Sequence, residues 1–183
     1  MKSIGFKEWS LVCDALGRGE QSIILRKGGI AEGCEKFSFQ HREFFLFPTF
    51  FHEQATKVRI ASASPPESRD IITIRWYAKA ENALKIDSLG IAEALSPLHI
   101  LMPEVVRERF GYKDEGLHVA FLRVFELSPS WILQNERRFA GCRSWVDLPL
   151  PPEMKMRPVV DDGAHQRIRA DFDRLTGSSL TPD

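Results

Sequence analysis

The sequence predicts an α+β protein with a mixed, strongly curved sheet or small barrel and helices packed outside it. Strand-like and helix-like segments follow one another without the regular alternation of strand and crossover helix that is typical of a parallel α/β sheet. The chain has 183 residues, 43% of them hydrophobic, which is enough to bury one full core. We therefore predict a single globular domain over residues 1–183.

The N-terminal part is predicted to begin with a short amphipathic helix over residues 6–16. The apolar side chains that recur there at helical spacing are Phe6, Trp9, Val12, Cys13 and Leu16. The stretch "SIILRK", residues 22–27, has the β-branched content of a strand and ends at the turn residues Gly28 and Gly29. We expect one of these two glycines to take a positive φ angle.

Two further elements are predicted before residue 60. The run "EFFLFPTFF", residues 43–51, indicates a second strand that Pro48 closes, because proline has no amide hydrogen to donate to a sheet. The residues after it favour a short helix with Thr49 as its N-cap.

The central part is predicted to hold a strand, a helix pair and a buried strand. Residues 62–70 have the composition of a loop, and residues 71–80 alternate as a strand with Ile72, Ile74 and Trp76 on one face. Residues 90–112 indicate two short helices split at Pro97 or Pro103. Both faces of residues 117–127 are largely apolar, which predicts a central strand covered on each side.

The C-terminal part is predicted to be a surface segment followed by a helix. Residues 149–158 are rich in proline and should extend over the surface. Residues 161–175 then form a helix that Asp161 or Asp162 caps. The side chains expected to face inward are Ile168, Phe172 and Leu175.

Composition limits the setting and the kind of partner. The 25 basic and 25 acidic residues cancel, so a polyanion would have to be bound by a local patch. Three widely spaced cysteines argue against a disulfide framework and favour a reducing compartment. The start of the chain lacks the apolar core of a signal peptide, and no apolar run approaches the about 18 residues of a membrane span. We expect a cytoplasmic protein that does not contact a membrane.

No motif of a known catalytic class is complete. The five histidines form no pairs at metal-binding spacing, and no CxxC accompanies them. The stretch "FHEQAT" begins like a zinc-protease motif, but Thr56 stands where the second histidine belongs. We therefore expect neither a metal nor a cofactor.

Cations and aromatic residues on the predicted strands are the main candidate binding residues. Arg26 shares a strand face with Ser22 and Ile24, and Arg123 lies on a strand that is otherwise apolar. A guanidinium group in such a place requires a partner. That partner is either a carboxylate such as Glu8 or Glu126, or a phosphate or base edge of a ligand.

The neighbouring residues extend this candidate site. Lys27 lies on the opposite face from Arg26, so we expect it to point to water and to contribute long-range attraction. Arg143 and Trp145 share a face if their segment is extended, and they stack on each other unless Trp145 stacks on a base. The other aromatic residues that either stack on a base or belong to the core are Phe50, Phe51 and Trp76.

A family resemblance covers most of the chain. The stretches "KEWSLVCDALGRGEQSIILRKGGI", "FFLFPTFFHEQ", "LHVAFLRVFEL" and "GCRSWVDLP" resemble a bacterial family of domains of unknown function. More remotely, "EWSLVCDALGRGEQSIILR" is similar to the opening of ASCH domains, which implies a PUA-like barrel. Of the ASCH pattern Gly-x-Lys-x-x-Glu-x-Arg, Gly19 and Arg26 fit, whereas Gln21 and Ile24 replace the Lys and the Glu.

The favoured function is noncatalytic recognition of RNA, DNA or a modified nucleotide in a basic and aromatic cleft. Its candidate residues are Arg26, Lys27, Phe51, Arg123, Arg143 and Trp145. The first alternative is an enzyme, metal-assisted or acid–base, that acts on a nucleotide or a nucleic-acid phosphodiester with His52 and Glu53 as acid–base groups. The second alternative is a protein-interaction subunit, and protein partners are left open.

Overall fold

The fold is one mixed sheet with helices packed around it. A computed structural model describes residues 3–27, 39–50, 52–59, 70–114, 116–141 and 143–178. In these residues seven strands follow the order β2-β5-β4-β3-β1-β6, with β7 beside β5. The pair β1 and β3 is parallel, and the other pairs are antiparallel. The strands are β1 (Ile4–Trp9), β2 (Ile23–Arg26), β3 (Glu43–Thr49), β4 (Ile71–Ile86), β5 (Leu117–Gln134), β6 (Trp145–Asp147) and β7 (Lys155–Pro158).

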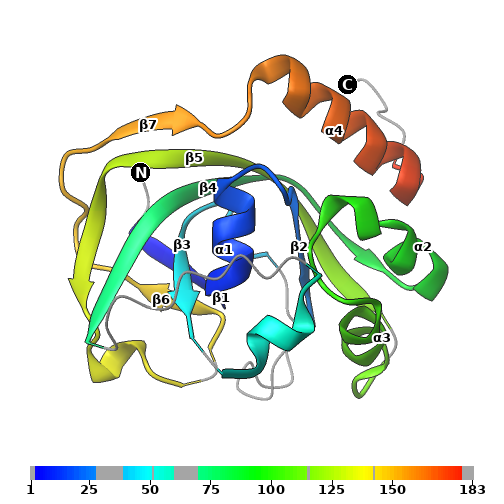
Figure 1. The fold of residues 1–183 in the computed structure, drawn as a ribbon, viewed down its shortest axis with the longest axis horizontal. Helices are drawn as coiled ribbons and strands as arrows, with labels where there is room; N and C mark the ends of the chain where they lie inside the picture. The colour runs from blue at the N-terminus through cyan, green and yellow to red at the C-terminus, as the bar shows by residue number, and fades with distance from the viewer. Residues whose placement is uncertain are drawn as a thin grey trace.

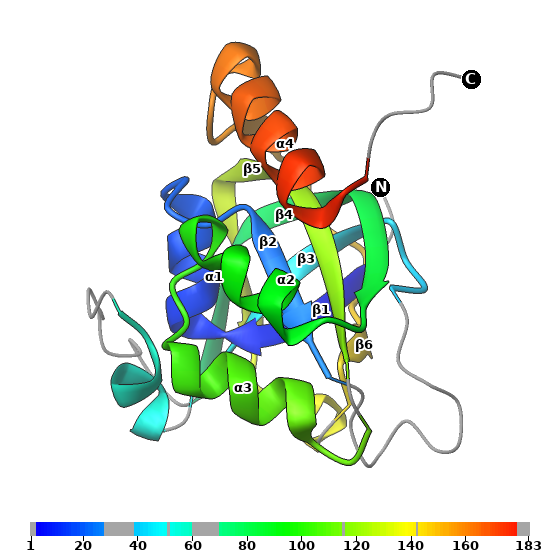
Figure 2. The same cartoon turned by 90° about the vertical axis from the view of Figure 1, so that its right-hand side faces the viewer.

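The helices pack against the curved sheet (Figure 1 and Figure 2). They are α1 (Ser10–Gly17), α2 (Leu89–Ala94), α3 (Pro103–Gly111) and α4 (Asp162–Thr176), with 3-10 turns η2 (His52–Lys57), η3 (Ser96–Leu98) and η4 (Arg137–Phe139). Figure 1 shows the long strands β4 and β5 curving around α1, with α4 along the top. Figure 2 shows α2 and α3 together on the side of the sheet near β2. None of the described helices is long and apolar enough to cross a membrane.

The predicted α+β class with a mixed, curved sheet and peripheral helices is confirmed. The sheet is open, because β2 and β6 end the strand order and do not pair with each other. Apolar side chains are buried in two clusters, one that includes Leu16, Leu122 and Phe172 and one that includes Tyr77 and Trp131. The helices α1 to α4 pack into the first of these clusters, and the second is formed mainly by the strands.

Residues 6–9 differ from the prediction of a helix over 6–16. They belong to β1, and α1 begins at Ser10. Phe6 is fully buried and lies opposite Leu46 in the parallel pair with β3. Of the residues at helical spacing, Val12, Cys13 and Leu16 lie in α1, whereas Phe6 and Trp9 lie in β1. The hydrogen bonds of the sheet therefore override the helical pattern of the first two.

Strand β4 departs from simple alternation at two β-bulges. The register with β5 shifts between Ile74 and Trp76, and again between Ala80 and Asn82. The prediction that Trp76 shares a face with Ile72 and Ile74 is wrong, because the first bulge turns Trp76 toward the cluster on the α1 side.

Most other elements are confirmed with small changes. Residues 22–27, 43–51, 71–80 and 117–127 hold β2, β3, β4 and β5, of which the last two run longer than predicted. The helix pair is split as expected, since Pro97 lies in η3 and Pro103 begins α3. Gly28, Gly29 and residues 62–69 lie outside the described residues.

The helix ends show how local chemistry sets the boundaries. Asp161 caps α4 by accepting a hydrogen bond from the backbone N–H of Ala164 at 2.7 Å, as predicted. Thr49 is not the cap of η2: it belongs to β3, and its hydroxyl donates to the backbone oxygen of Glu8 at 2.9 Å.

A glycine pair tests the packing of α1 on β4. A Cβ atom at Gly17 would lie 2.1 Å from Cε2 of Trp76, whereas a Cβ at Gly111 would meet nothing within 4 Å. We expect Gly17→Ala to lower the free energy of unfolding by about 1–3 kcal/mol, because the indole cannot move without disturbing the core. Gly111→Ala should be neutral or slightly stabilising. Urea denaturation of both variants measures this, and equal midpoints would contradict the close contact.

Candidate functional site

Glu8 is a buried carboxylate at the end of β1. The residue is 2% exposed. Its Oε1 accepts a hydrogen bond from the backbone N–H of Trp9 at 2.8 Å, and its Oε2 lies 3.8 Å from Nη1 of Arg26. A buried carboxylate is unfavourable unless it is hydrogen-bonded and paired, so the fold must keep a cation beside it.

Arg26 supplies that cation from the end of β2. Its Nη2 donates to Oγ of Ser144 at 3.1 Å, and its guanidinium carbon lies 5.5 Å from the centre of the Phe6 ring. Ser144 directly precedes β6, and the backbone N–H of Lys7 donates to its carbonyl at 2.8 Å. Arg26 therefore connects β2 with the segment that leads into β6, the two open ends of the sheet.

A second arginine approaches from α3. The guanidinium carbon of Arg109 lies 4.5 Å from the ring centre of Trp9, and its Nη1 donates to the backbone oxygen of Leu25 at 2.7 Å. Burial lowers the pKa of Arg109, the charge of Glu8 opposes that effect, and the charge of Arg26 adds to it. We name Glu8, Arg26 and Arg109 the Glu8 cluster. It contains two guanidinium groups and one carboxylate.

Aromatic rings border the cluster. The indole of Trp145 lies edge-on to Phe6, Phe44 and His41, with ring centres 4.7, 5.3 and 5.0 Å away. Its Nε1 is buried and has no hydrogen-bond partner among the residues that the structure describes. The predicted stack of Arg143 on Trp145 is not present: in the described part of the chain Arg143 is exposed and makes none of these ring contacts.

Lys27 differs from its predicted orientation toward water. Its Nζ donates to the backbone oxygens of Phe110, Asp114 and Gly116. The ammonium group thus satisfies carbonyls at the C-terminal end of α3, where a positive charge also interacts favourably with the helix dipole. This position gives Lys27 a role in holding α3 beside β2.

The candidate acid–base pair lies at η2. His52 is the first residue of η2, its side chain is outside the described part, and Glu53 is exposed. Phe51 also lies outside the described residues. The residue of η2 that turns inward is Gln54, whose Oε1 accepts from Oγ of Ser10 at 3.2 Å and from the N–H of Leu11 at 3.4 Å. Gln54 thereby caps α1.

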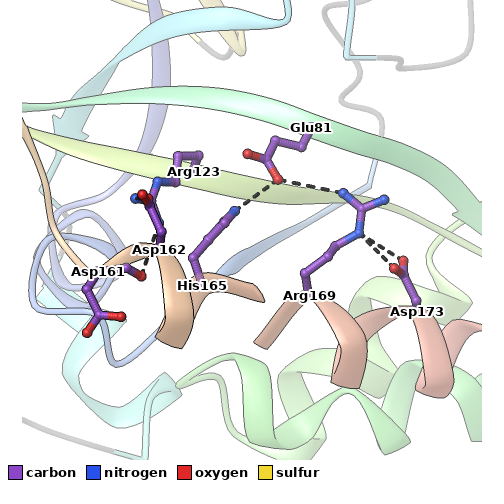
Figure 3. Close-up of polar contacts among 7 residues, drawn as sticks. All are labelled: Glu81, Arg123, Asp161, Asp162, His165, Arg169 and Asp173. Atoms are coloured by element: carbon purple, nitrogen blue, oxygen red, sulfur yellow. Dashed lines mark hydrogen bonds and ion pairs between the residues drawn. The ribbon is translucent and has the colours of Figure 1, made fainter. Parts of the chain in front are cut away.

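Arg123 belongs to a different group of charges, which holds α4 on the sheet. It pairs with Oδ1 of Asp162, the first residue of α4 (Figure 3). The expectation of a carboxylate partner is met, but the partner is not Glu126, which pairs with Arg157 at 2.6 Å. His118 lies opposite Arg26, and Arg123 lies further along β5, so the structure does not bring Arg123 into the Glu8 cluster.

Two members of the site escaped sequence reasoning. Arg109 lies in a helix with a charged sequence, and nothing in that pattern separates it from its solvent-facing neighbours. Ser144 is 2% exposed, and its importance arises only from the approach of Arg26. Among the described residues, no three His, Cys, Asp or Glu side chains gather as metal ligands would.

Comparisons with known proteins identify a family and similar folds. The family described as "Domain of unknown function (DUF1802)" matches residues 5–171. No curated protein matches the chain. A crystal structure of ASCH from Zymomonas mobilis is similar, with 13% identity, 67% of each chain covered and a TM-score of 0.42. Crystal structures of two point mutants of that protein are similar as well. The first has 13% identity, covers 81% of this chain and 91% of its own, and has a TM-score of 0.48. The second has 11% identity, covers 92% of this chain and 95% of its own, and has a TM-score of 0.43.

A mutant cycle tests the ion pair of the cluster. We expect Arg26→Ala to destabilise the protein by less than the roughly 3–5 kcal/mol of a fully buried broken pair, because Arg109 still acts on Glu8. Adding Glu8→Gln removes the uncompensated carboxylate, so the double variant should be more stable than the sum of the single effects by about 0.5–3 kcal/mol. Urea denaturation gives all four free energies, and strict additivity would mean that the two side chains do not interact.

The buried imidazole of His99 predicts a pH dependence of stability. Its Nδ1 accepts from the N–H of Leu101 at 3.1 Å, and burial, Arg59 and Arg109 lower its pKa from 6.5 to about 3. The unfolded chain therefore binds a proton that the folded chain does not, and this contribution to stability is lost as the pH falls from 6.5 toward 3. His99→Asn keeps an acceptor for Leu101 but does not titrate. Its unfolding free energy should fall less than that of the wild type over this range, and parallel curves would contradict the assignment.

Proposed function

Because this chain belongs to the DUF1802 family, a domain of unknown function, we propose its function from the site alone: noncatalytic recognition of a phosphate-bearing ligand, either a nucleotide or a nucleic acid. The Glu8 cluster holds the phosphate, and the half-buried rings of Trp9 and Trp145 beside it favour a ligand that also carries a base. Two guanidinium groups against one carboxylate leave one positive charge that an anion would compensate.

The observation that carries the proposal is the state of the Arg26 guanidinium group. It is 22% exposed and has five N–H donors, of which one makes a hydrogen bond in the described part of the chain, to Ser144. Its distance of 3.8 Å from Glu8 is an ion-pair distance and too long for a hydrogen bond. Arg26 is therefore held in place by its neighbours while most of its donors remain available for phosphate oxygens.

The buried N–H of Trp145 supports a ligand with further acceptor atoms. A buried donor without a partner is uncommon and unfavourable, and among the described residues none accepts from this N–H, so a group that reaches it with an acceptor atom would be stabilised. Trp145 contacts Phe6, and Arg26 lies over the same ring, so the indole and the guanidinium group border one region of the protein.

The contacts of the described residues favour binding over catalysis. The thiol of Cys13 is buried, and burial raises its pKa well above 9.0, so it is not a ready nucleophile. Glu53, the candidate acid–base residue of the enzyme alternative, is exposed and makes none of the contacts of the Glu8 cluster. No observation favours the enzyme alternative specifically.

A titration of short single-stranded oligonucleotides and of a mononucleotide tests the proposal. Arg26→Lys keeps the charge that Glu8 requires but removes the planar, forked donor set. We expect this substitution to weaken oligonucleotide binding by about 1–3 kcal/mol. The affinity of the wild-type protein should fall modestly as the salt concentration rises from about 50 to 200 mM. Arg157→Lys, at a side chain that is 81% exposed on β7, is the matched control and should bind like the wild type.

Thermal melting of the same proteins separates binding from folding. A folded Arg26→Lys protein with wild-type affinity would remove Arg26 from the ligand site. If no probe binds at any salt concentration, the phosphate-binding proposal fails and the protein-interaction alternative becomes the better hypothesis.

A further inference from the structure

A hollow of about 390 Å³ lies beside β4, and the sequence analysis did not anticipate it. Its lining includes an aromatic ring, an amide and three basic side chains: Phe39, Asn82, Arg42, Lys85 and His118. The volume is within the range of about 300–1,000 Å³ that small-molecule sites in proteins occupy.

The second bulge of β4 creates this hollow. The register shift between Ala80 and Asn82 leaves Glu81 without a partner residue on β5. Glu81 points instead toward α4, where His165 lies 2.9 Å and Arg169 3.6 Å from its Oε2 (Figure 3). The strand continues with the exposed Ala83, which lines the hollow and lies opposite the buried Ala120. Bulges of this kind often lie next to functional sites.

Two independent contacts connect the hollow with the Glu8 cluster. His118 lines the hollow and lies directly opposite Arg26 in the β2–β5 pair, so the two side chains project from the same face of the sheet. Phe39 lines the hollow as well, and its ring centre is 5.8 Å from that of Phe6, the ring beneath Arg26. The hollow therefore lies on the face of the sheet from which Arg26 projects, with His118 and Phe39 between its lining and the guanidinium group that the proposed function assigns to phosphate.

The chemistry of the lining fits a nucleobase. Phe39 offers an aromatic ring for stacking, and Lys85, which lies opposite His118, borders the hollow on the face from which Arg26 projects. The charge of Glu81 is balanced by Arg169, and that of Lys85 by Asp87. In the described part of the chain Arg42 is exposed and forms no ion pair, which favours an anionic ligand over a cationic one.

We propose that the hollow receives a single unpaired nucleobase whose phosphate is held by Arg26. The ligand is then a mononucleotide or one unpaired nucleotide of a single strand, and a duplex is excluded because its bases are stacked and paired. This inference rests on the proposed function and adds the class of ligand to it.

The test compares probes that share a phosphate but differ in the base. Inorganic phosphate, ribose 5-phosphate, the four nucleoside 5′-monophosphates, a single-stranded oligonucleotide and its duplex are titrated into the full chain. We expect at least one monophosphate to bind about tenfold or more tightly than ribose 5-phosphate, and the single strand to bind more tightly than the duplex.

Three variants locate the base. Ala83→Phe fills the hollow and should bring the preferred monophosphate to the affinity of ribose 5-phosphate, whose own binding stays unchanged. Phe39→Leu keeps apolar packing against Phe6 but removes the aromatic face. It should weaken binding of the preferred monophosphate, by less than Ala83→Phe does. Gln134→Phe adds an exposed ring at the other end of β5 and should change nothing. If Ala83→Phe does not fold, Phe39→Leu decides the question.

The two proposals fail separately. Equal affinities for monophosphates and ribose 5-phosphate, both weakened by Arg26→Lys, would overturn the nucleobase site and leave phosphate binding intact. A duplex that binds as tightly as the single strand would also overturn the nucleobase site and leave phosphate binding intact. If no phosphate-bearing probe binds, both the nucleobase site and the proposed function are overturned.

Discussion

The burial of one carboxylate organises this protein. Glu8 lies where β1 turns into α1, and its charge is tolerable only beside a cation. Arg26 reaches it from β2 and also binds Ser144 next to β6, while Arg109 brings α3 against Trp9. Elements far apart in the sequence therefore meet around a single ionic group, which explains why polar residues are conspicuous in an otherwise apolar interior.

The same arrangement prepares the surface for a ligand. Glu8 has two guanidinium groups nearby, so the three side chains of the cluster carry one net positive charge, of which the charge of Glu108 on α3 offsets a part at Arg109. The charged residues of α4 act on the hollow beside β4. His165 and Arg169 lie close to the Glu81 carboxylate, so the negative charge of Glu81 is compensated at the helix. Structural ion pairs and the proposed ligand site thus depend on each other, although they lie on different elements.

The sequence predicted the features that follow from local periodicity. Alternation over residues 117–127 and the cap at Asp161 identified β5 and α4, because their patterns act over one strand or one helical turn. Bulges in β4 leave no such pattern, and the spacing of Phe6 and Trp9 suits a helix as well as a strand. Glu8 was foreseen as a partner of Arg26 because a buried guanidinium group must be paired. The role of Arg109 required the docking of α3, which no short stretch of sequence specifies. The carboxylate that reaches Arg26 comes from β1.

The link between Arg26 and Ser144 has a mechanical consequence. A sheet closed by a strand-to-strand ladder opens only when several backbone hydrogen bonds break together. In the described part of the chain, β2 and the segment before β6 are instead joined by one side-chain hydrogen bond, from Arg26 to Ser144. A net contribution of about 0.5–1.5 kcal/mol is comparable to thermal energy. A substitution of Arg26 therefore acts on this link directly while every backbone ladder of the sheet remains intact, and it also removes a cation from beside Glu8.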